Sequence, residues 1–283
     1  MLDLLNPHAG DTDTFDLAVV GAGSAGFSAA ITAAEDGARV ALIGYGTIGG
    51  TCVNVGCVPS KAMIRAVETL HAAKWADRFD GVEATAKLTD WAALVAQKQA
   101  LVDDLRAAKY VDVLPNYEGV TYIEGRASFA SDGSLLVGDR TIRAPKVIIA
   151  TGSSPQLPNI PGLDGIDFLD STSALEQAQL PKSLIVMGGG YIGVEIAQIF
   201  ARAGVEVTIV TRRGLLPEAE PEVSETLTEA FADEGITVLD GLAYDRFQKS
   251  GEAVILHAAH NGVAVRIEAE KLLLATGRTP NTE

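Results

Sequence analysis

The chain has 283 residues, enough for two domains, and its 47% hydrophobic and 21% charged residues are typical of a folded globular protein. The net charge of −15 disfavours binding to nucleic acids and to anionic membranes. No window approaches the roughly 20 apolar residues that span a bilayer. The acidic start also lacks the cationic region of a signal peptide, so we expect a cytoplasmic protein.

Residues 1–14 are expected to form a short flexible tail, and the apolar run 15–20 predicts the first strand. A G-x-G-x-x-G fingerprint follows, then an alanine-rich stretch that predicts a helix over 27–36 and a buried strand over 38–43. Such a β-α-β unit is typical of a dinucleotide site, because its glycines allow a tight turn and its helix N-terminus attracts phosphates. The residues expected to contact the dinucleotide here are Gly21, Gly23, Ser24, Ala25 and Gly26.

The same unit recurs later in the chain. A strand over 183–187 leads into the string G-G-G-Y-I-G, which is followed by a helix ending at Arg202 and a strand over 205–210. The string at 146–152 also matches that at 271–277, and each closes a segment that began with a fingerprint. Two nucleotide-binding domains of related design are therefore expected.

The segment between the two units predicts two long helices, over 60–79 and 90–110, from apolar residues at three- and four-residue spacing. Turn-forming residues at 153–162 predict the crossing between domains. We therefore expect an α/β protein with two Rossmann-like dinucleotide-binding domains of three-layer type. The expected ranges are 15–152 for the first domain, 153–276 for the second, and 277–283 for the return towards the first domain.

The position that usually carries a ribose-binding carboxylate differs in both units. In the first unit Gly44 ends the second strand, so the ribose must be bound differently or loosely. In the second unit Arg212 and Arg213 stand there, and guanidinium groups suit the charge of a 2′-phosphate. These arginines favour NADPH over NADH, although two solvated surface arginines would give the same pattern.

The chain has two cysteines, Cys52 and Cys57, directly before a helix that is expected to start near Pro59. A helix N-terminus stabilises an anion, so thiolate character should be promoted, especially at Cys57. Zinc would need further regularly spaced ligands, and a structural disulfide is improbable in a reducing compartment. The pair therefore predicts redox chemistry, and the histidines, His8, His71, His257 and His260, are interpreted as structural or surface residues.

The string G-G-T-C-V-N-V-G-C-V-P-S-K at 49–61 resembles the pyridine nucleotide–disulfide oxidoreductases, the superfamily of glutathione reductase and lipoamide dehydrogenase. Within it, the strings at 46–57 and 102–110 and the final A-T-G-R-T-P-N-T are similar to those of the mercuric reductases. The resemblance covers nearly the whole chain from Asp16 onward.

This resemblance implies FAD and NADPH as cofactors. The residues implied to contact FAD are Gly21, Gly23, Gly26, Gly46, Thr51, Lys61, Ala127 and Thr151, and those implied for NADPH are Gly188, Gly190, Gly193, Arg212 and Arg213. Further cofactor contacts are expected at Ser24, Ala25, Gly50, Gly152, Tyr191, Ile192 and Gly277.

The resemblance also implies a catalytic set. Cys57 would contact the flavin and Cys52 would face the substrate, with Tyr191 covering the flavin face and Lys61 paired with Glu195 beside the ring. The less favoured alternative for that pair is a surface ion pair without function. A thiol complex of Hg(II) would bind Cys52 and Cys57 and be reduced to Hg(0), because soft metals prefer thiolates. The complete chain is expected to form a homodimer.

Three functions stay open at this stage. The first is an NADPH-dependent Hg(II) reductase that confers mercury resistance. The second is a lipoamide dehydrogenase-like disulfide reductase, against which Arg212 and Arg213 count. The third is a non-catalytic flavoprotein or metal-binding module. Because the sequence stops in a loop at Glu283, we also expect a fragment that lacks a C-terminal interface domain.

Overall fold

The structure is a computed structural model that describes residues 13–283. The described chain forms two compact units, unit 1 with residues 13–58, 99–153 and 280–283, and unit 2 with residues 59–98 and 154–279. Residues 1–12, most of the expected tail and including His8, lie outside the described residues. Among residues 13–283, no helix combines the length and apolar character needed to cross a bilayer.

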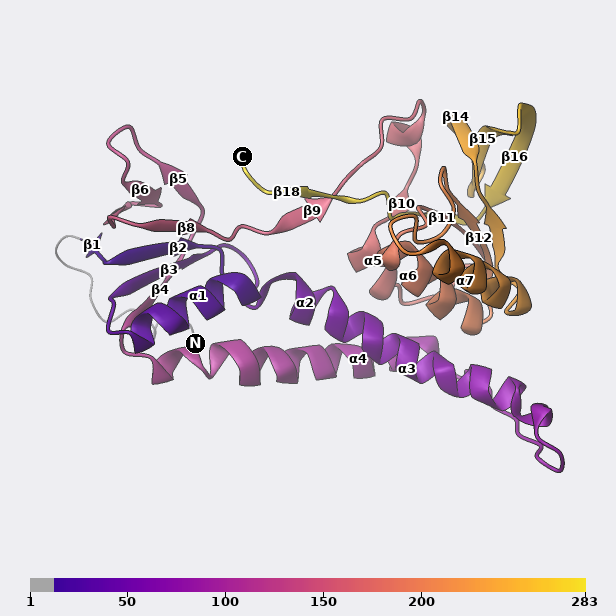
Figure 1. Cartoon of the computed structure of the whole chain (residues 1–283), viewed down its shortest axis with the longest axis horizontal. Helices are drawn as coiled ribbons and strands as arrows, with labels where there is room; N and C mark the ends of the chain where they lie inside the picture. The colour runs from indigo at the N-terminus through magenta and orange to yellow at the C-terminus, as the bar shows by residue number, and fades with distance from the viewer. Residues whose placement is uncertain (1–12) are drawn as a thin grey trace. The chain divides into compact units, whose positions relative to one another are not determined.

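Unit 1 contains two four-stranded sheets. Its elements are β1 (Asp13–Thr14), β2 (Leu17–Val20), α1 (Ser24–Glu35), β3 (Val40–Gly44), α2 (Gly50–Asn54), the π-helical turn η3 (Ala107–Val111), the 3-10 turn η4 (Leu114–Asn116), β4 (Val120–Glu124), β5 (Ala127–Phe129), β6 (Leu135–Val137), β7 (Arg140–Arg143) and β8 (Val147–Ile149). One sheet is parallel in the order β4-β3-β2-β8, and the other has the order β1-β7-β6-β5. Helix α1 covers one face of the parallel sheet and the second sheet covers the other, which gives three layers (Figure 1).

The two faces of β2 supply the two cores of unit 1. Leu17 and Val19 pack with Phe27 of α1, whereas Ala18 between them packs with Ile142 of the second sheet. Successive side chains of a strand point to opposite faces, so a continuous apolar run serves a strand that is covered on both sides. This is why the run at 15–20 could be recognised as a buried strand.

Three elements join the units in the sequence: α3 (Cys57–Lys74), the 3-10 turn η2 (Ala76–Arg78) and α4 (Trp91–Arg106). From residue 59 to residue 98 this segment belongs to unit 2, where Met63 and Trp91 are buried in a shared core. The Trp91 ring lies 5.8 Å from that of Phe200, and its Nε1 donates to the carbonyl of Gln177 at 2.7 Å. From the sequence, residues 59–98 are expected to lie within the first domain, because its range is 15–152. The assignment of a nucleotide to each domain stays a prediction.

Unit 2 repeats the three-layer design. Its elements are η5 (Leu163–Gly165), β10 (Phe168–Leu169), α5 (Ser171–Leu175), β11 (Ser183–Met187), α6 (Tyr191–Arg202), β12 (Glu206–Val210), α7 (Pro221–Asp233), β13 (Thr237–Leu239), β14 (Leu242–Ser250), β15 (Ala253–His260), β16 (Val263–Ala269) and β17 (Lys271–Leu274). The parallel sheet has the order β10-β17-β11-β12-β13, and β14-β15-β16 form an antiparallel sheet. Strands β9 (Ser153–Pro155) and β18 (Arg278–Pro280) pair where the chain crosses between units.

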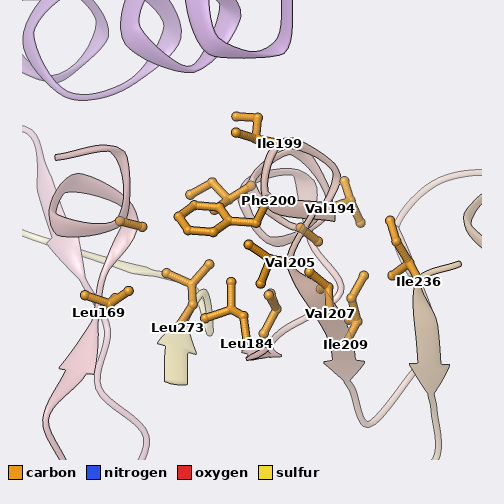
Figure 2. Packing of buried hydrophobic residues seen from close by; sticks show 14 of the residues in the cluster. Leu169, Leu184, Val194, Ile199, Phe200, Val205, Val207, Ile209, Ile236 and Leu273 are labelled. Atoms are coloured by element: carbon orange, nitrogen blue, oxygen red, sulfur yellow. The ribbon is translucent and has the colours of Figure 1, made fainter. Parts of the chain in front are cut away.

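The central strand β11 again divides its side chains between two cores. Leu184 and Val186 pack with Phe200 of α6, whereas Ile185 and Met187 face the core shared with the antiparallel sheet. Figure 2 shows Phe200 and Leu184 within the first of these cores. The predicted α/β class with two Rossmann-like domains is confirmed, and in both units the third layer is a second sheet.

The end of the expected tail is ordered. Asp13 and Thr14 form β1, which pairs in parallel with Ile142 and Arg143 of β7. The Arg140 guanidinium donates two hydrogen bonds to the Asp13 carboxylate, at 2.7 and 2.9 Å, and these bonds lower the pKa of that carboxyl. The ion pair between Asp13 and Arg140 thereby holds the short strand β1 in the sheet, and the sequence of the tail alone does not indicate this.

In unit 2, an ion cluster connects α3, α6 and the C-terminal end of α7. Arg202 of α6 donates to both oxygens of the largely buried Glu234 at 2.6 and 2.7 Å, and Gln198 adds a bond of 2.9 Å. His71 of α3 lies 3.8 Å from the same carboxylate, which supports its interpretation as structural. Burial alone would raise the pKa of Glu234, but the bonds and charge of Arg202 lower it overall.

Replacing Arg202 by Leu should cost about 3–5 kcal/mol of unfolding free energy, because it leaves a buried carboxylate without its cation. In the wild type, the ionised Glu234 carboxylate paired with Arg202 stabilises the folded state. This stabilisation is fully present above the ordinary pKa of 4.5 and is lost as pH falls through the lowered pKa of the folded state. The variant should lack this loss. Urea unfolding across a pH series measures both effects. Arg65→Leu, which breaks only an exposed pair with Glu68, is the control, and an equal cost in both variants would contradict the cluster's role.

Candidate active site

The first fingerprint lies where β2 ends and α1 begins. Gly21 has a φ of +120°, and a Cβ at Gly26 would overlap the Gly21 carbonyl oxygen, so helix and turn approach as closely as glycine permits. Gly23 precedes α1 without a side-chain cap, which leaves the amide groups of the first turn for an anion. Ser24 and Ala25 are exposed in that turn. These features fit a bound pyrophosphate.

Backbone contacts bring the cysteine-bearing segment to this fingerprint. Gly23 and Gly49 form a parallel bridge, and the Gly49 amide donates to the carbonyl of Ala22 at 2.9 Å. A Cβ at Gly50 would lie 2.6 Å from the Cα of Gly23, so the two chains touch backbone to backbone. Thr51, also an expected FAD contact, follows in α2 and is exposed. The structure therefore places seven expected contacts in one region of unit 1, namely Gly21, Gly23, Ser24, Ala25, Gly26, Gly50 and Thr51.

The two cysteines belong to successive helices. Cys52 lies in α2 and Cys57 is the first residue of α3, and both are exposed thiols. A hydrogen bond between them, together with burial, raises the pKa of Cys52, against a smaller opposing effect of the Lys109 charge. The thiolate character expected next to a helix N-terminus is therefore not found at Cys52. Across residues 13–283, no three His, Cys, Asp or Glu side chains gather into a metal site.

Helix α2 is fixed by a side chain that the sequence analysis did not single out. Asn54 donates to the carbonyls of Ile48 and Gly50, each at 2.9 Å, and so closes the short helix on itself. Its own oxygen accepts a bond from Arg106 of α4 at 3.2 Å, and Arg106 is held in turn by Asp103 at 2.8 Å. The helix that carries Cys52 is thereby attached to the end of α4.

The π-helical turn after α4 makes a second connection to the fingerprint. Tyr110 packs edge-on against Phe27 of α1 with ring centroids 4.8 Å apart, and its hydroxyl lies 2.9 Å from that of Ser24. Single π-helical turns often mark functional sites. The predicted helix over 90–110 missed this change, and only the similarity of the string at 102–110 to the mercuric reductases pointed to the region.

The second fingerprint repeats the geometry of the first. Gly188 has a φ of +122°, and a Cβ at Gly193 would overlap the Gly188 carbonyl oxygen. Gly190 precedes α6 without a side-chain cap, and nothing lies within 4 Å of a Cβ built there. Tyr191 and Ile192 follow in the first turn, and Tyr191 is 65% exposed. This turn likewise fits a pyrophosphate.

The two arginines after β12 differ in their surroundings. The Arg212 guanidinium carbon lies 5.0 Å from the ring centre of Tyr244, which holds the side chain by a cation–π contact. The neighbouring Arg213 forms an exposed ion pair with Glu218 at 2.8 Å. The Thr211 carbonyl accepts a bond from the Leu242 amide at 3.1 Å, so the start of β14, which carries Tyr244, is fixed beside the arginines. Arg212 is therefore held against β14, whereas Arg213 pairs with a residue of its own exposed loop.

Lys61 and Glu195, expected as a pair, are joined within unit 2. Lys61 Nζ lies 2.5 Å from Glu195 Oε1, and the Ser60 hydroxyl donates to Oε2 at 3.3 Å. The Lys61 side chain is 59% exposed and that of Glu195 34%. The two side chains that the sequence analysis expects as a pair therefore lie in direct contact.

The other expected cofactor contacts lie at strand ends. The backbone N–H of Asn281 donates to the Gly152 carbonyl at 3.0 Å, and the Thr151 hydroxyl donates to the Asn281 carbonyl. The last described residues therefore lie beside the end of β8. Gly46 is exposed after β3, and Ala127 begins β5. In unit 2, the Gly277 carbonyl accepts a bond from the Gln156 amide at 2.9 Å.

Comparison with known proteins gives a consistent result. The model of the family described as pyridine nucleotide-disulphide oxidoreductase matches residues 15–283. The chain belongs to this family. It is 43% identical over 272 residues to a mercuric reductase of Lysinibacillus sphaericus, with 96% of this chain and 50% of the relative covered. It is 45% identical over 267 residues to that of Bacillus cereus, with 94% and 42% covered.

Solved structures agree with the family. The chain is similar to the HOCl-induced flavoprotein disulfide reductase RclA of Escherichia coli in its Cu(II) complex, with 30% identity and a TM-score of 0.82. That comparison covers 96% of this chain and 58% of the other. The chain thus spans about half the length of the curated relatives named above. Family membership implies a flavin, FAD, and a pyridine nucleotide as cofactors.

Replacing Cys57 by Ala should lower the pKa of Cys52, because the hydrogen bond and charge of Cys57 are among the causes that raise it. Alkylation of Cys52 by iodoacetamide at neutral pH should then accelerate, by on the order of tenfold for each unit by which its pKa falls. The reduced protein is assayed by mass spectrometry across a pH series. Lys109→Met should shift the profile the opposite way, and an unchanged profile in Cys57→Ala would contradict the coupling.

Proposed function

We propose that the whole protein is an NADPH-dependent flavoenzyme that reduces Hg(II) to Hg(0) in the cytoplasm, as a homodimer. The observation that carries this proposal is the pair of exposed, mutually hydrogen-bonded thiols beside a dinucleotide fingerprint. Similarity to several curated mercuric reductases at 40–45% identity supports the choice of substrate. Two thiols without a third ligand suit a soft ion that accepts sulfur, whereas zinc sites need three or four protein ligands.

The residues of unit 1 fit FAD. The first turn of α1 offers amide donors at Ser24 and Ala25, and the backbone contact between Gly23 and Gly50 leaves a surface free of side chains. FAD, when bound, would supply the redox chemistry that takes electrons from NADPH and passes them to the acceptor at the cysteine pair, Hg(II) or a disulfide. We assign FAD to the first domain and NADPH to the second, where the turn before α6 and Arg212 provide the matching contacts.

In the proposed reaction, the two thiols bind the metal and release their own protons as they do so. Because the two cysteines are hydrogen-bonded thiols, taking up Hg(II) from a small-thiol complex requires both sulfur atoms to release their protons. Overall, Hg(SR)₂, NADPH and one proton give Hg(0), NADP⁺ and two RSH. Cys52 is proposed as the substrate-facing sulfur and Cys57 as the one that contacts the flavin, and the two electrons would reduce the Hg(II) that both sulfur atoms hold. Lys61, Glu195 and Tyr191 keep their proposed catalytic roles.

A second candidate function is the reduction of a disulfide. It is favoured by the structural similarity to a flavoprotein disulfide reductase, and the same cysteine pair would serve it by thiol–disulfide exchange. A lipoamide dehydrogenase-like enzyme that prefers NADH is less favoured because Arg212 and Arg213 occupy the position of the ribose-binding carboxylate. A flavoprotein without catalysis is a third possibility that the exposed thiols disfavour.

The full-length protein should oxidise NADPH when Hg(II) is added with excess small thiol. Cys52→Ala should remove this activity, on the order of a hundredfold or more, since one sulfur cannot replace a two-thiolate site. NADPH oxidation with a dye that takes electrons from the flavin should persist in the variant, as should the flavin absorbance. Negligible turnover with Hg(II) beside rapid turnover with lipoamide or glutathione disulfide would overturn the mercury assignment in favour of the second candidate.

Arg212→Met should raise the KM for NADPH by on the order of tenfold while changing the KM for NADH little, because only NADPH carries the 2′-phosphate. Steady-state kinetics with both coenzymes and the same acceptor measure the ratio. Arg266→Met, which removes an exposed arginine of β16 paired with Glu268, is the matched control. A parallel loss for both coenzymes would show that Arg212 does not read the 2′-phosphate.

A further inference from the structure

The sequence lacks a carboxylate at the end of β3, and the structure shows why none can stand there. A Cβ built on Gly44 would lie 2.6 Å from the Tyr122 hydroxyl oxygen and 2.7 Å from the ring carbon Cε2 of the same residue. On another side it would lie 2.8 Å from the Cβ of Ala22. Even alanine would therefore collide at this position, so the space of the usual ribose-binding side chain is filled by Tyr122 and Ala22.

The register of the sheet explains how Tyr122 reaches this place. Strands β3 and β4 are parallel, with Leu42 opposite Tyr122 and Gly44 opposite Glu124. The Tyr122 ring therefore extends along the strands towards their carboxyl ends, and its hydroxyl lies level with Gly44. Ala22 is the second residue of the first fingerprint, G-A-G-S-A-G. The hydroxyl thus lies at the carboxyl edge of the sheet beside the pyrophosphate turn, where dinucleotides bind in this fold.

We propose that the Tyr122 hydroxyl replaces the missing carboxylate and hydrogen-bonds the ribose of the adenosine part of FAD. This inference rests on the proposed binding of FAD to unit 1. It assigns to β4 a contact that dinucleotide folds of this type usually make from the end of the preceding strand. It also gives a functional reason why Gly44 stands beside the large side chain of Tyr122 in this chain.

The chemistry of the phenol suits this task. Among the described residues, no group hydrogen-bonds the Tyr122 hydroxyl, so both its proton and its lone pairs are available to a ligand. Burial, and to a smaller extent the charge of Glu124, raise the pKa of Tyr122, so the phenol stays neutral at physiological pH. A neutral hydroxyl recognises a ribose hydroxyl by one hydrogen bond, without the charge that a carboxylate would bring.

The test uses apoprotein made from the full-length flavoprotein, with FAD and its 2′-deoxyadenosine analogue as ligands. Flavin fluorescence gives both dissociation constants. The wild type should bind FAD about tenfold more tightly than the analogue, the effect of one hydrogen bond. Tyr122→Phe keeps the ring that fills the space at Gly44 and should bind both ligands equally, at the level of the analogue.

Glu124→Gln is the matched control, because Glu124 is the nearest carboxylate in the register and is exposed. It should keep the preference for FAD. A lost preference in Glu124→Gln, or a retained one in Tyr122→Phe, would overturn the inference. If the wild-type apoprotein bound neither ligand, the proposed FAD function would fail instead, so the two failures are distinguishable.

A reciprocal exchange tests the coupling of the two positions. Tyr122→Val alone should lose the preference for FAD, and Gly44→Glu alone should bind FAD poorly because the new side chain collides with the tyrosine. The double variant Gly44→Glu, Tyr122→Val has room for the carboxylate and should regain a preference for FAD over the analogue. A double variant no better than Tyr122→Val would show that the two side chains do not serve the same ribose.

Discussion

The parallel bridge between Gly23 and Gly49 is the contact on which the arrangement of unit 1 depends. It is made by backbone atoms alone and is reinforced by the Gly49 amide on the Ala22 carbonyl. Because the bridge ends where α2 begins, it fixes the helix that carries Cys52 at the fingerprint turn. Side-chain bonds from Asn54 then hold that helix at its other end. The Cys52 sulfur is therefore positioned by a scaffold that does not include it, which leaves the sulfur available for the proposed chemistry.

The parallel sheets were accessible to sequence reasoning, and the second sheets were not. Strands covered on both faces read as continuous apolar runs, and β11 was predicted with the bounds that the structure has. The strands of the second sheets are short or half-exposed, as at β6 and β14, so their apolar residues are too few or too widely spaced to stand out. Neither the ordering of β1 by Arg140 nor the π-helical turn near Tyr110 leaves a local signal.

The residues of the candidate site likewise fall into those that the sequence predicts and those that only the structure reveals. Spacing and glycine positions predicted the two fingerprints and the cysteine pair, since these signals are local in the chain. Asn54 and Arg106 are 52 residues apart, and no pattern in either segment shows that they bond. Gly44 is the instructive case, because the sequence showed a missing carboxylate but only the structure showed that Tyr122 fills its space. Residues that position a site through long-range contacts are thus invisible until the fold is known.

The raised pKa of Cys52 has a consequence for the proposed cycle. A helix N-terminus would favour a thiolate, yet the hydrogen bond to Cys57 keeps the proton on Cys52 in the absence of substrate. In the proposed cycle, Hg(II) displaces that proton because sulfur binds the metal more strongly, and the complex of two thiolates with Hg(II) carries no net charge. Neutral Hg(0) is a poor partner for a thiolate, and its departure restores the conditions under which Cys52 takes up a proton. Under the proposed function, the hydrogen bond that disfavours the free Cys52 thiolate would therefore favour its reprotonation once the metal has left.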